Sequence, residues 1–525
     1  MKKESAQILW FTQVGKEDIP LVGGKGANLG EMYRNGIPVP NGFCVTAKAY
    51  FDFIKKTSLK QKIITELSGL DVQDSKALMK ASKNIKTAIL GAEMPVDLEE
   101  EIKRYYQELC GNDDRKVAVR SSATAEDLPD ASFAGQQETY LNIIGHMDVI
   151  KHVQMCWASL FEARAIFYRT QNRFNHLKVG IAVPVQLMVQ SEVSGIMFTV
   201  NPTTNNRGEV SIEAAFGLGQ PIVSGEITPD QFIVNKKTLD ITYKYITKQT
   251  WQFTDDGEVS VSKAYQEKQK LPDRLVKELA RLGMKVEAHY GRPQDLEWGY
   301  EDGKLYIVQS RPVTTLNVSA KGKGEVTASN EKKSKLLMEG LGASPGAAAG
   351  KVRIISSPSQ ISKVKTGDIL VAEMTNPDYV PAMKKASAIL TDKGGRTSHA
   401  AIVSRELGIP AVVGSNVATK MLKDGELITV DGTTGKVFEG DVVTKSSQPA
   451  EEISTLINGE PIKTATKIYM NLAEPELAAD MAMRNVDGVG LLRAEFMIAQ
   501  LGVHPRKFIK DGKEKEFISH MADGL

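Results

Sequence analysis

Cysteine is scarce in this chain, and long apolar runs are missing. The sequence holds only Cys44, Cys110 and Cys156, which form no CxxC pair, so neither a disulfide framework nor a zinc site is indicated. No apolar run approaches the ~18 residues that a membrane-spanning helix needs, and the first residues lack the apolar core of a signal peptide. We therefore expect a cytoplasmic protein without a membrane segment.

An excess of charge of either sign is also missing. The 66 basic and 64 acidic residues give a net charge of +2, which provides no electrostatic case for a nucleic-acid partner. Hydrophobic content of 42% and charged content of 25% are those of an ordinary soluble protein. At 525 residues the chain is too long for one core, and about three domains are expected.

The most informative stretch covers residues 391–414. A short apolar strand, 387–390, leads into the glycine pair 394–395, which turns the chain. Thr397-Ser398 suits a helix N-cap, and the residues that follow have helical composition. His399 is therefore expected in the first turn of a helix, where unpaired backbone N–H groups and the positive dipole end favour an anion.

A histidine in such a place has two interpretations. A lone histidine most often caps a helix or packs in a core. The exposed glycine pair, however, and the neighbouring Arg396, which can add charge-assisted hydrogen bonds, favour a histidine that carries a phosphoryl group. We take His399 as the candidate nucleophile.

Two segments upstream have features of a phosphate site. Residues 21–32 are glycine-rich, contain Lys25 and lead into a helix, and exposed amides beside a lysine suit a nucleotide phosphate. A structural glycine turn is the alternative. Residues 117–120 form a short apolar strand that ends in Arg120, which offers a bidentate fork to phosphoryl oxygens. An arginine paired with an acid is the alternative there.

A predicted hairpin places further polar side chains together. Its strands are 295–299 and 305–312, joined by a polar turn. Alternation puts Asp295 and Glu297 on one face of the first strand, and Gln309 and Arg311 on one face of the second. If the register pairs these faces, their oxygens suit Mg²⁺ that bridges nucleotide phosphates. A solvated hairpin face is the alternative.

These motifs together resemble those of a known family. Residues 394–414, Gly-Gly-Arg-Thr-Ser-His-Ala-Ala-Ile-Val onward, are similar to the phosphohistidine signature of the phosphoenolpyruvate-utilising enzymes. The upstream pieces resemble the ATP-grasp-like nucleotide domain of the dikinases, and the segment around 488–497 resembles an opening unit of the pyruvate-binding barrel. The resemblance implies a multidomain α/β and α+β fold: a nucleotide-binding domain, a swivelling α/β phosphohistidine domain and the start of a (β/α)8 barrel.

The resemblance also implies roles for single residues. His399, Arg311 and Arg120 would be catalytic, and Glu297 and Gln309 would hold Mg²⁺. Arg493 would bind the substrate. The nucleotide would be bound by Lys25, Arg120, Met188 at the adenine, Glu213 near the ribose, Asp295, Glu297 and Gln309.

The expected domain boundaries follow the polar stretches. The nucleotide domain would cover 1–316, the phosphohistidine domain 339–441, and the barrel units 464–525, with linkers at 317–338 and 442–463. A complete barrel needs about 250 residues, so we expect a truncated barrel. The chain alone is then expected to carry out only the half-reaction between ATP and His399. A homodimer is implied when the full barrel is present.

The resemblance is closest to phosphoenolpyruvate synthases. It implies an enzyme, a pyruvate, water dikinase, that converts ATP, pyruvate and water to AMP, phosphoenolpyruvate and phosphate. The alternatives are a pyruvate phosphate dikinase and a non-catalytic nucleotide-binding fragment. Antibiotic phosphotransferases place the histidine domain last, so the motif around Arg493 argues against them.

Overall fold

The described part of the chain forms two compact units, Met1–Ser446 and Ser447–Leu525. The computed structural model describes residues 3–443 apart from 73, 112, 125–126, 129–130, 133–137, 172–173, 314–333 and 397, and beyond them 466–467, 469–472, 478, 486–492 and 505–523. Most of the two expected linkers therefore lies outside the described residues. The end of the first, from Leu336, already belongs to a strand.

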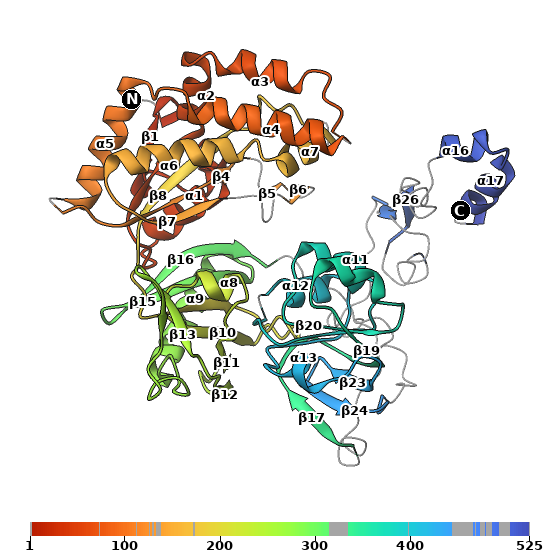
Figure 1. Cartoon of the computed structure of the whole chain (residues 1–525). Helices are drawn as coiled ribbons and strands as arrows, with labels where there is room; N and C mark the ends of the chain where they lie inside the picture. Colours follow the sequence, from red (N-terminus) through yellow and green to blue (C-terminus); the bar gives the residue numbers. More distant parts are fainter. Residues whose placement is uncertain are drawn as a thin grey trace. The chain divides into compact units, whose positions relative to one another are not determined.

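The first sheet has the strand order β1-β2-β8-β3-β7, with β4 also paired to β8. Helices cover it, as Figure 1 shows, and Phe53, Ile85 and Trp157 pack with Val119 and Val183 in one core. The strands are β1 (Ile8–Trp10), β2 (Gly42–Val45), β3 (Val117–Arg120), β4 (Ser122–Ala123), β7 (Thr139–Ile143) and β8 (Ile181–Leu187), and β5 (Asp127–Leu128) pairs separately with β6 (Ala131–Ser132). The helices are α2 (Ala47–Lys56), α3 (Leu59–Leu67), α4 (Ser75–Leu90), α5 (Val96–Cys110), α6 (His146–Ser159) and α7 (Ala163–Gln171).

The glycine-rich segment is more helical than the sequence predicts. Helix α1 spans Ile19–Arg34 and is interrupted only at Gly23, where φ is 67° and ψ is 173°. A Cβ at Gly23 would lie 2.2 Å from Ser122 Oγ and 2.4 Å from its carbonyl oxygen. The glycine therefore serves both the positive φ and the close approach to β4, and the expected open loop is reduced to a kink.

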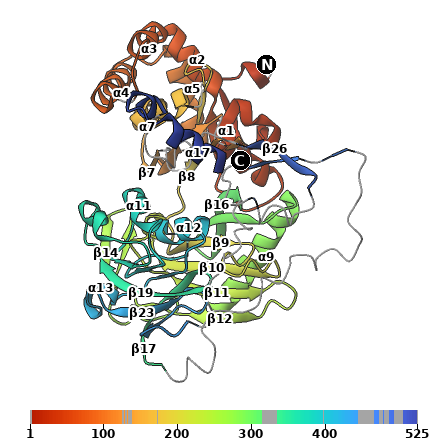
Figure 2. The ribbon, with the colours of Figure 1, turned by 90° about the vertical axis from the view of Figure 1, so that its right-hand side faces the viewer.

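The second sheet carries the predicted hairpin at one edge. Its order is β12-β11-β10-β9-β15-β16, all antiparallel. Helix α9 (Asp273–Tyr290) lies along this sheet in Figure 2, and its Leu275 and Leu279 share a core with Ile212 and Trp298. The strands are β9 (Val193–Phe198), β10 (Glu209–Phe216), β11 (Asp230–Asn235), β12 (Ile241–Tyr245), β15 (Gln294–Glu301) and β16 (Lys304–Pro312); α8 (Gln220–Val223) and the pair β13 (Trp251–Thr254) and β14 (Gly257–Ser260) lie outside it.

The third sheet has eight strands and belongs to the domain in which His399 begins a helix. Its order is β17-β24-β23-β19-β20-β21-β22-β18, and β19 to β22 run parallel. The short strand expected from the sequence at 387–390 is confirmed as β21. The strands are β17 (Leu336–Glu339), β18 (Leu341–Ser344), β19 (Ala347–Ile354), β20 (Ile369–Ala372), β21 (Ala388–Thr391), β22 (Ala411–Val413), β23 (Leu427–Asp431) and β24 (Lys436–Glu439), and the helices are α11 (Val380–Met383), α12 (His399–Glu406) and α13 (Ala418–Met421).

The second unit is described only in pieces. Strand β25 (Tyr469–Leu472) pairs parallel with β26 (Gly488–Leu492), and α16 (Pro505–Lys510) and α17 (Glu514–Asp523) follow. A parallel pair requires a crossover between its strands, which agrees with the βα pattern of the sequence, while the barrel itself stays a prediction. Arg493 lies outside the described residues. Among the described helices of both units, none is long and apolar enough to cross a membrane.

Candidate active site

The polar side chains of the β15–β16 hairpin meet in the predicted way. The register pairs Glu297 with Gln309 and Asp295 with Arg311. Paired residues of antiparallel strands share a face, so the four side chains lie on one side of the sheet. Gln309 Nε2 donates a hydrogen bond to Glu297 Oε1 at 2.7 Å. The sequence-based expectation that these faces are paired is therefore confirmed.

Arg120 reaches this hairpin from the first sheet. Its Nη2 donates to Gln309 Oε1 and lies 3.7 Å from Glu297 Oε2, while Nη1 donates to the carbonyl of Val308 at 2.9 Å. The side chain is buried. The guanidinium is thus held between two sheets. An arginine and the side-chain oxygens of Glu297 and Gln309, which are far from it in the sequence, meet there.

Lys25 lies beside the strand that presents Arg120. Lys25 Nζ donates to the carbonyl of Ser121 at 3.3 Å, directly after β3. One turn further along α1, Asn28 Nδ2 donates to the carbonyl of Ser310 on β16 at 3.4 Å. Helix α1 therefore touches both sheets, and the glycine-rich segment, Arg120 and the hairpin form one polar site.

Asp295 has an unusual acidity. Burial and, to a smaller extent, the negative charge of Glu297 raise its pKa to about 7, although the positive charge of Arg311 opposes the rise. Perturbed carboxylates of this kind gather at functional sites. Arg311 itself is exposed on β16, so its guanidinium is accessible to a ligand.

Met188 and Glu213 are the residues expected at the adenine and at the ribose of the nucleotide. Met188 follows the end of β8, and its backbone N–H donates to the carbonyl of Lys116 at 3.0 Å. Glu213 on β10 is 1% exposed and accepts from Gln231 Nε2 at 3.0 Å and from the backbone N–H of Arg396 at 2.6 Å. The contacts expected with adenine and ribose stay predictions.

The hairpin fits a magnesium ion that arrives with a nucleotide. In the part of the chain that the structure describes, no three or more acidic, histidine or cysteine side chains gather into a metal cage. Mg²⁺ bound to nucleotides uses one or two carboxylates together with phosphate oxygens and water. Glu297 and Gln309 offer one carboxylate and one amide oxygen for that purpose, and in this structure oxygens of both lie at the Arg120 guanidinium.

His399 begins α12, at the carboxyl end of the parallel strand β21, as the sequence predicts. Its Nδ1 lies 2.9 Å from Thr375 Oγ1, and burial lowers its pKa below the ordinary value. Because Nδ1 has a partner, Nε2 is the nitrogen left for chemistry. The sequence analysis missed Thr375, since nothing in the polar segment after β20 distinguishes it from any other loop threonine.

Ser398 and Arg396 differ from expectation. Ser398 has N-cap geometry with extended backbone, but among the described residues its side chain makes no capping bond and its buried Oγ has no hydrogen-bond partner. Arg396 Nε donates to the carbonyl of Gly342 at 2.9 Å, and its guanidinium lies 6.0 Å from the centre of the Tyr243 ring. The Arg396 side chain is buried, and its hydrogen bonds to a phosphoryl group stay a prediction.

Comparisons with known proteins match both parts of this site. Residues 19–333 match the family model "pyruvate phosphate dikinase, AMP/ATP-binding domain", and residues 364–435 match "PEP-utilising enzyme, mobile domain". The chain is 49% identical to the phosphoenolpyruvate synthase of Pyrococcus furiosus, over 99% of this chain and 69% of that protein. It is 51% identical to the probable phosphoenolpyruvate synthase of Archaeoglobus fulgidus (97% and 68% covered) and 44% identical to the phosphoenolpyruvate synthase of Aquifex aeolicus (96% and 62% covered).

Proposed function

The chain belongs to the phosphoenolpyruvate synthase family, and we propose that it forms phosphoenolpyruvate from pyruvate, ATP and water, with AMP and phosphate as the other products. His399 carries the phosphoryl group between the two halves of the reaction. The observation that supports this most strongly is the setting of His399: a partly buried imidazole at a helix N-terminus, with Thr375 at Nδ1 and the unpartnered hydroxyl of Ser398 beside it.

The first half-reaction follows from these contacts. Nδ1–H of His399 donates a hydrogen bond to Thr375 Oγ1, so the lone pair on Nε2 attacks the β-phosphorus of ATP. The N–P bond forms as the bond from the β-phosphorus to the α-phosphate oxygen breaks, so AMP leaves and a pyrophosphoryl group is on Nε2. Water then attacks the γ-phosphorus and releases inorganic phosphate, which leaves the β-phosphoryl group on Nε2. Splitting the reaction through a phosphoenzyme lets one ATP drive a thermodynamically difficult product.

The nucleotide site supplies position and charge. Lys25 and Arg120 bind phosphate oxygens, and Arg311 faces the transferred group. Mg²⁺ held by Glu297 and Gln309 would neutralise phosphate charge when bound. Preorganised cations of this kind stabilise the charge that develops in phosphoryl transfer. Asp295 lies beside the metal ligands, Met188 is assigned to the adenine, and the ribose contact of Glu213 stays a prediction.

We propose the finer organisation on the same basis. Residues 1–316 form the nucleotide domain, 339–441 the swivelling histidine domain, and 464–525 the first barrel units, joined by linkers at 317–338 and 442–463. Arg493 would bind pyruvate or phosphoenolpyruvate in the barrel. A cytoplasmic location and a homodimer with a full barrel complete the proposal.

The test is direct phosphorylation of the protein. Incubation with Mg²⁺ and ATP should give one acid-labile phosphate per chain, and His399→Ala should give none. His152→Ala is a matched control, because His152 is half-buried on α6 and its described contacts are with the carbonyl of Asp148 and the ring of Tyr140, away from the histidine loop. Equal labelling of the wild type and His399→Ala would refute the assignment.

A pyruvate phosphate dikinase is the second candidate. Residues 19–333 match a dikinase nucleotide-binding domain, but the relatives at 44–51% identity are phosphoenolpyruvate synthases, so this alternative is not favoured. A dikinase uses inorganic phosphate where a synthase uses water. AMP formation that depends on added phosphate would therefore favour the dikinase, and AMP formation without it supports the synthase.

A further inference from the structure

Glu213 contacts the loop that presents the histidine. This histidine loop consists, in its described residues, of Gly394, Gly395, Arg396 and Ser398. Glu213 Oε1 accepts the backbone N–H of Arg396 at 2.6 Å, across 183 residues of sequence. Gln231 Nε2 donates to the same oxygen at 3.0 Å. A buried carboxylate of the nucleotide domain thus binds the backbone three residues before the candidate nucleophile.

A side chain at residue 395 would meet this carboxylate. A Cβ at residue 395 would lie 2.9 Å from both oxygens of Glu213, a separation that real Cβ atoms essentially never show. The backbone does not itself demand glycine at this position, because Gly394, with φ of 107°, has the left-handed conformation whereas Gly395 does not. The missing side chain at residue 395 therefore makes room for Glu213.

Further contacts lie around this one. A Cβ at Gly225 would lie 3.3 Å from Ser398 Cβ, and Thr203 Oγ1 donates to the carbonyl of Gly342 at 3.3 Å. Tyr245 at the end of β12 packs against the apolar core of the histidine domain. The histidine loop therefore packs against the nucleotide domain. Glu213 makes the charge-assisted hydrogen bond between them.

Glu213 also lies in the row of side chains that builds the phosphate site. The sheet register pairs Glu213 with Ile196, Ile196 with Glu297, and Glu297 with Gln309. These residues share one face of the sheet. The same face thus binds the histidine loop at β10 and presents the predicted metal ligands at β15 and β16, two and three strands away.

We propose that Glu213 is a positioning residue that docks the histidine loop at the nucleotide site, and that Gly395 is its required counterpart. The proposal rests on the proposed function, because only a histidine that takes its phosphate from this site needs to be held there. Glu213 acts in it through the backbone of Arg396 and does not touch the reacting atoms.

The first experiment is a double-mutant cycle in the full chain. Gly395→Ala is expected to slow phosphorylation of His399 by ATP at least tenfold, while the affinity for Mg²⁺-ATP stays within twofold, because residue 395 belongs to the histidine domain. Glu213→Ala is expected to slow it similarly. In the Glu213→Ala background, Gly395→Ala should then add less than a twofold effect, because the carboxylate it would meet is gone.

Gly219→Ala is the matched control. A Cβ there would make only an ordinary contact of 3.5 Å with Ser194 Oγ, and its φ of −74° suits alanine. Its phosphorylation rate should equal that of the wild type. If the effects of Glu213→Ala and Gly395→Ala multiply, or if Glu213→Ala mainly weakens Mg²⁺-ATP binding as a ribose contact would, the docking role is wrong.

A second experiment measures docking without catalysis. Dyes on Glu258→Cys in β14 and Lys423→Cys in the histidine domain would occupy exposed positions, whereas the three native cysteines are buried. Single-molecule energy transfer should show a docked population that falls in Gly395→Ala and persists in Gly219→Ala. If the docked population is unchanged in Gly395→Ala, the proposal is wrong, even if ATP phosphorylates His399. If the docked population falls, the docking proposal is supported, even if ATP does not phosphorylate His399.

Discussion

The chemistry of the candidate nucleophile is decided by its immediate neighbours. The hydroxyl of Thr375 is the hydrogen-bond partner of Nδ1 of His399. Partial burial disfavours the imidazolium and lowers the pKa of His399. A free histidine, with a pKa of about 6.5, is half charged near pH 6.5. His399 should therefore be mostly neutral at that pH, which is the state a nitrogen nucleophile requires.

This shift predicts a particular pH profile. Because the pKa in the folded protein is lowered, the neutral fraction stays high as the pH falls through about 6.5, and the rate of His399 phosphorylation should decline only at lower pH. Single-turnover phosphorylation between pH 8 and pH 5 would give the profile.

Side-chain NMR supplies the control for this prediction. The His399 resonance can be assigned among the seven histidines by its loss in His399→Ala, and its titration should share the midpoint of the rate. A midpoint at or above that of a free histidine would contradict the prediction.

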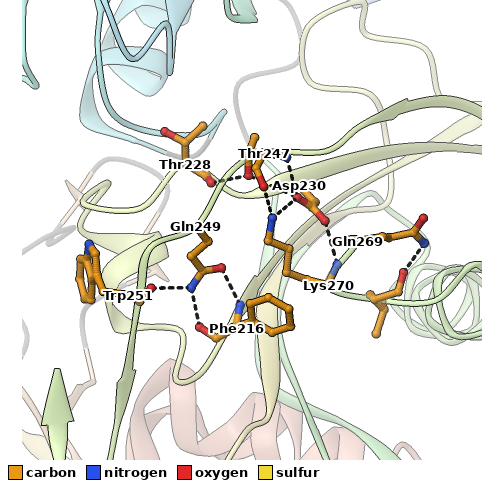
Figure 3. Close-up of polar contacts among 9 residues, drawn as sticks. Phe216, Thr228, Asp230, Thr247, Gln249, Trp251, Gln269 and Lys270 are labelled. Atoms are coloured by element: carbon orange, nitrogen blue, oxygen red, sulfur yellow. Dashed lines mark hydrogen bonds and ion pairs between the residues drawn. The ribbon is translucent and has the colours of Figure 1, made fainter. Parts of the chain in front are cut away.

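At the scale of the elements, a buried ion pair fixes the chain that follows β12. Lys270 Nζ donates to Asp230 Oδ1 at 2.8 Å, and both side chains have no exposed surface. Figure 3 shows how Thr247 joins them: its backbone N–H donates to Asp230 Oδ1 at 2.9 Å, and its hydroxyl donates to the carbonyl of Thr228 at 2.8 Å. The segment after β12 is therefore tied to the loop after α8, to β11 and to the segment before α9.

The same network supports the docking face. A Cβ added at Gly414 in the histidine domain would lie 2.7 Å from Thr228 Cγ2, so Thr228 lies close to the histidine domain. The Thr247 hydroxyl donates to the carbonyl of Thr228. Burial is the largest effect on Asp230 and raises its pKa, against the opposing charge of Lys270. Without that lysine the carboxylate would be buried without a counter-charge.

Lys270→Met is accordingly expected to lower the free energy of unfolding by about 3–5 kcal/mol, the usual consequence of removing one partner of a buried pair. Denaturant titration followed by circular dichroism would measure it. Lys268→Met is the matched control: Lys268 is exposed two residues away, and its loss should change the free energy of unfolding by less than ~0.5 kcal/mol. Equal stabilities of the two variants would show that the pair contributes nothing.

At the scale of the whole molecule, the nucleotide site is assembled from separate cores. Arg120 comes from the first sheet, Gln309 from the second, and Lys25 from the helix between them. A ligand that binds all three ties the two sheets together. It binds the folded chain only, so it stabilises that state by mass action.

Mg²⁺-ATP should therefore raise the thermal unfolding temperature. At a hundredfold excess over its Kd the gain is about 2.7 kcal/mol, which corresponds to a few degrees for a protein of this size. Arg120→Lys keeps the charge but loses the two-pronged fork and should show a clearly smaller rise, measured by calorimetry. An identical rise in wild type and Arg120→Lys would argue against a phosphate role for Arg120.

The sequence by itself determined the local elements. The alternation of Asp295 and Glu297 predicted the hairpin and the face of its polar groups, and the glycines followed by Thr397-Ser398 predicted that a helix begins near His399. Both signals depend on residues within a few positions of one another, because strand alternation and helix capping are local properties. The kink at Gly23 could not be predicted from the local sequence, because the close approach of Ser122 is part of its cause.

Only the tertiary structure decided which of these elements meet. The bond between Arg120 and Gln309 spans 189 residues, and the one between Glu213 and Arg396 spans 183. Even Thr375, 24 residues from His399, is placed by the parallel pairing of β20 with β21. Such contacts depend on how sheets pack and pair over long distances, and no local pattern of residues records that choice.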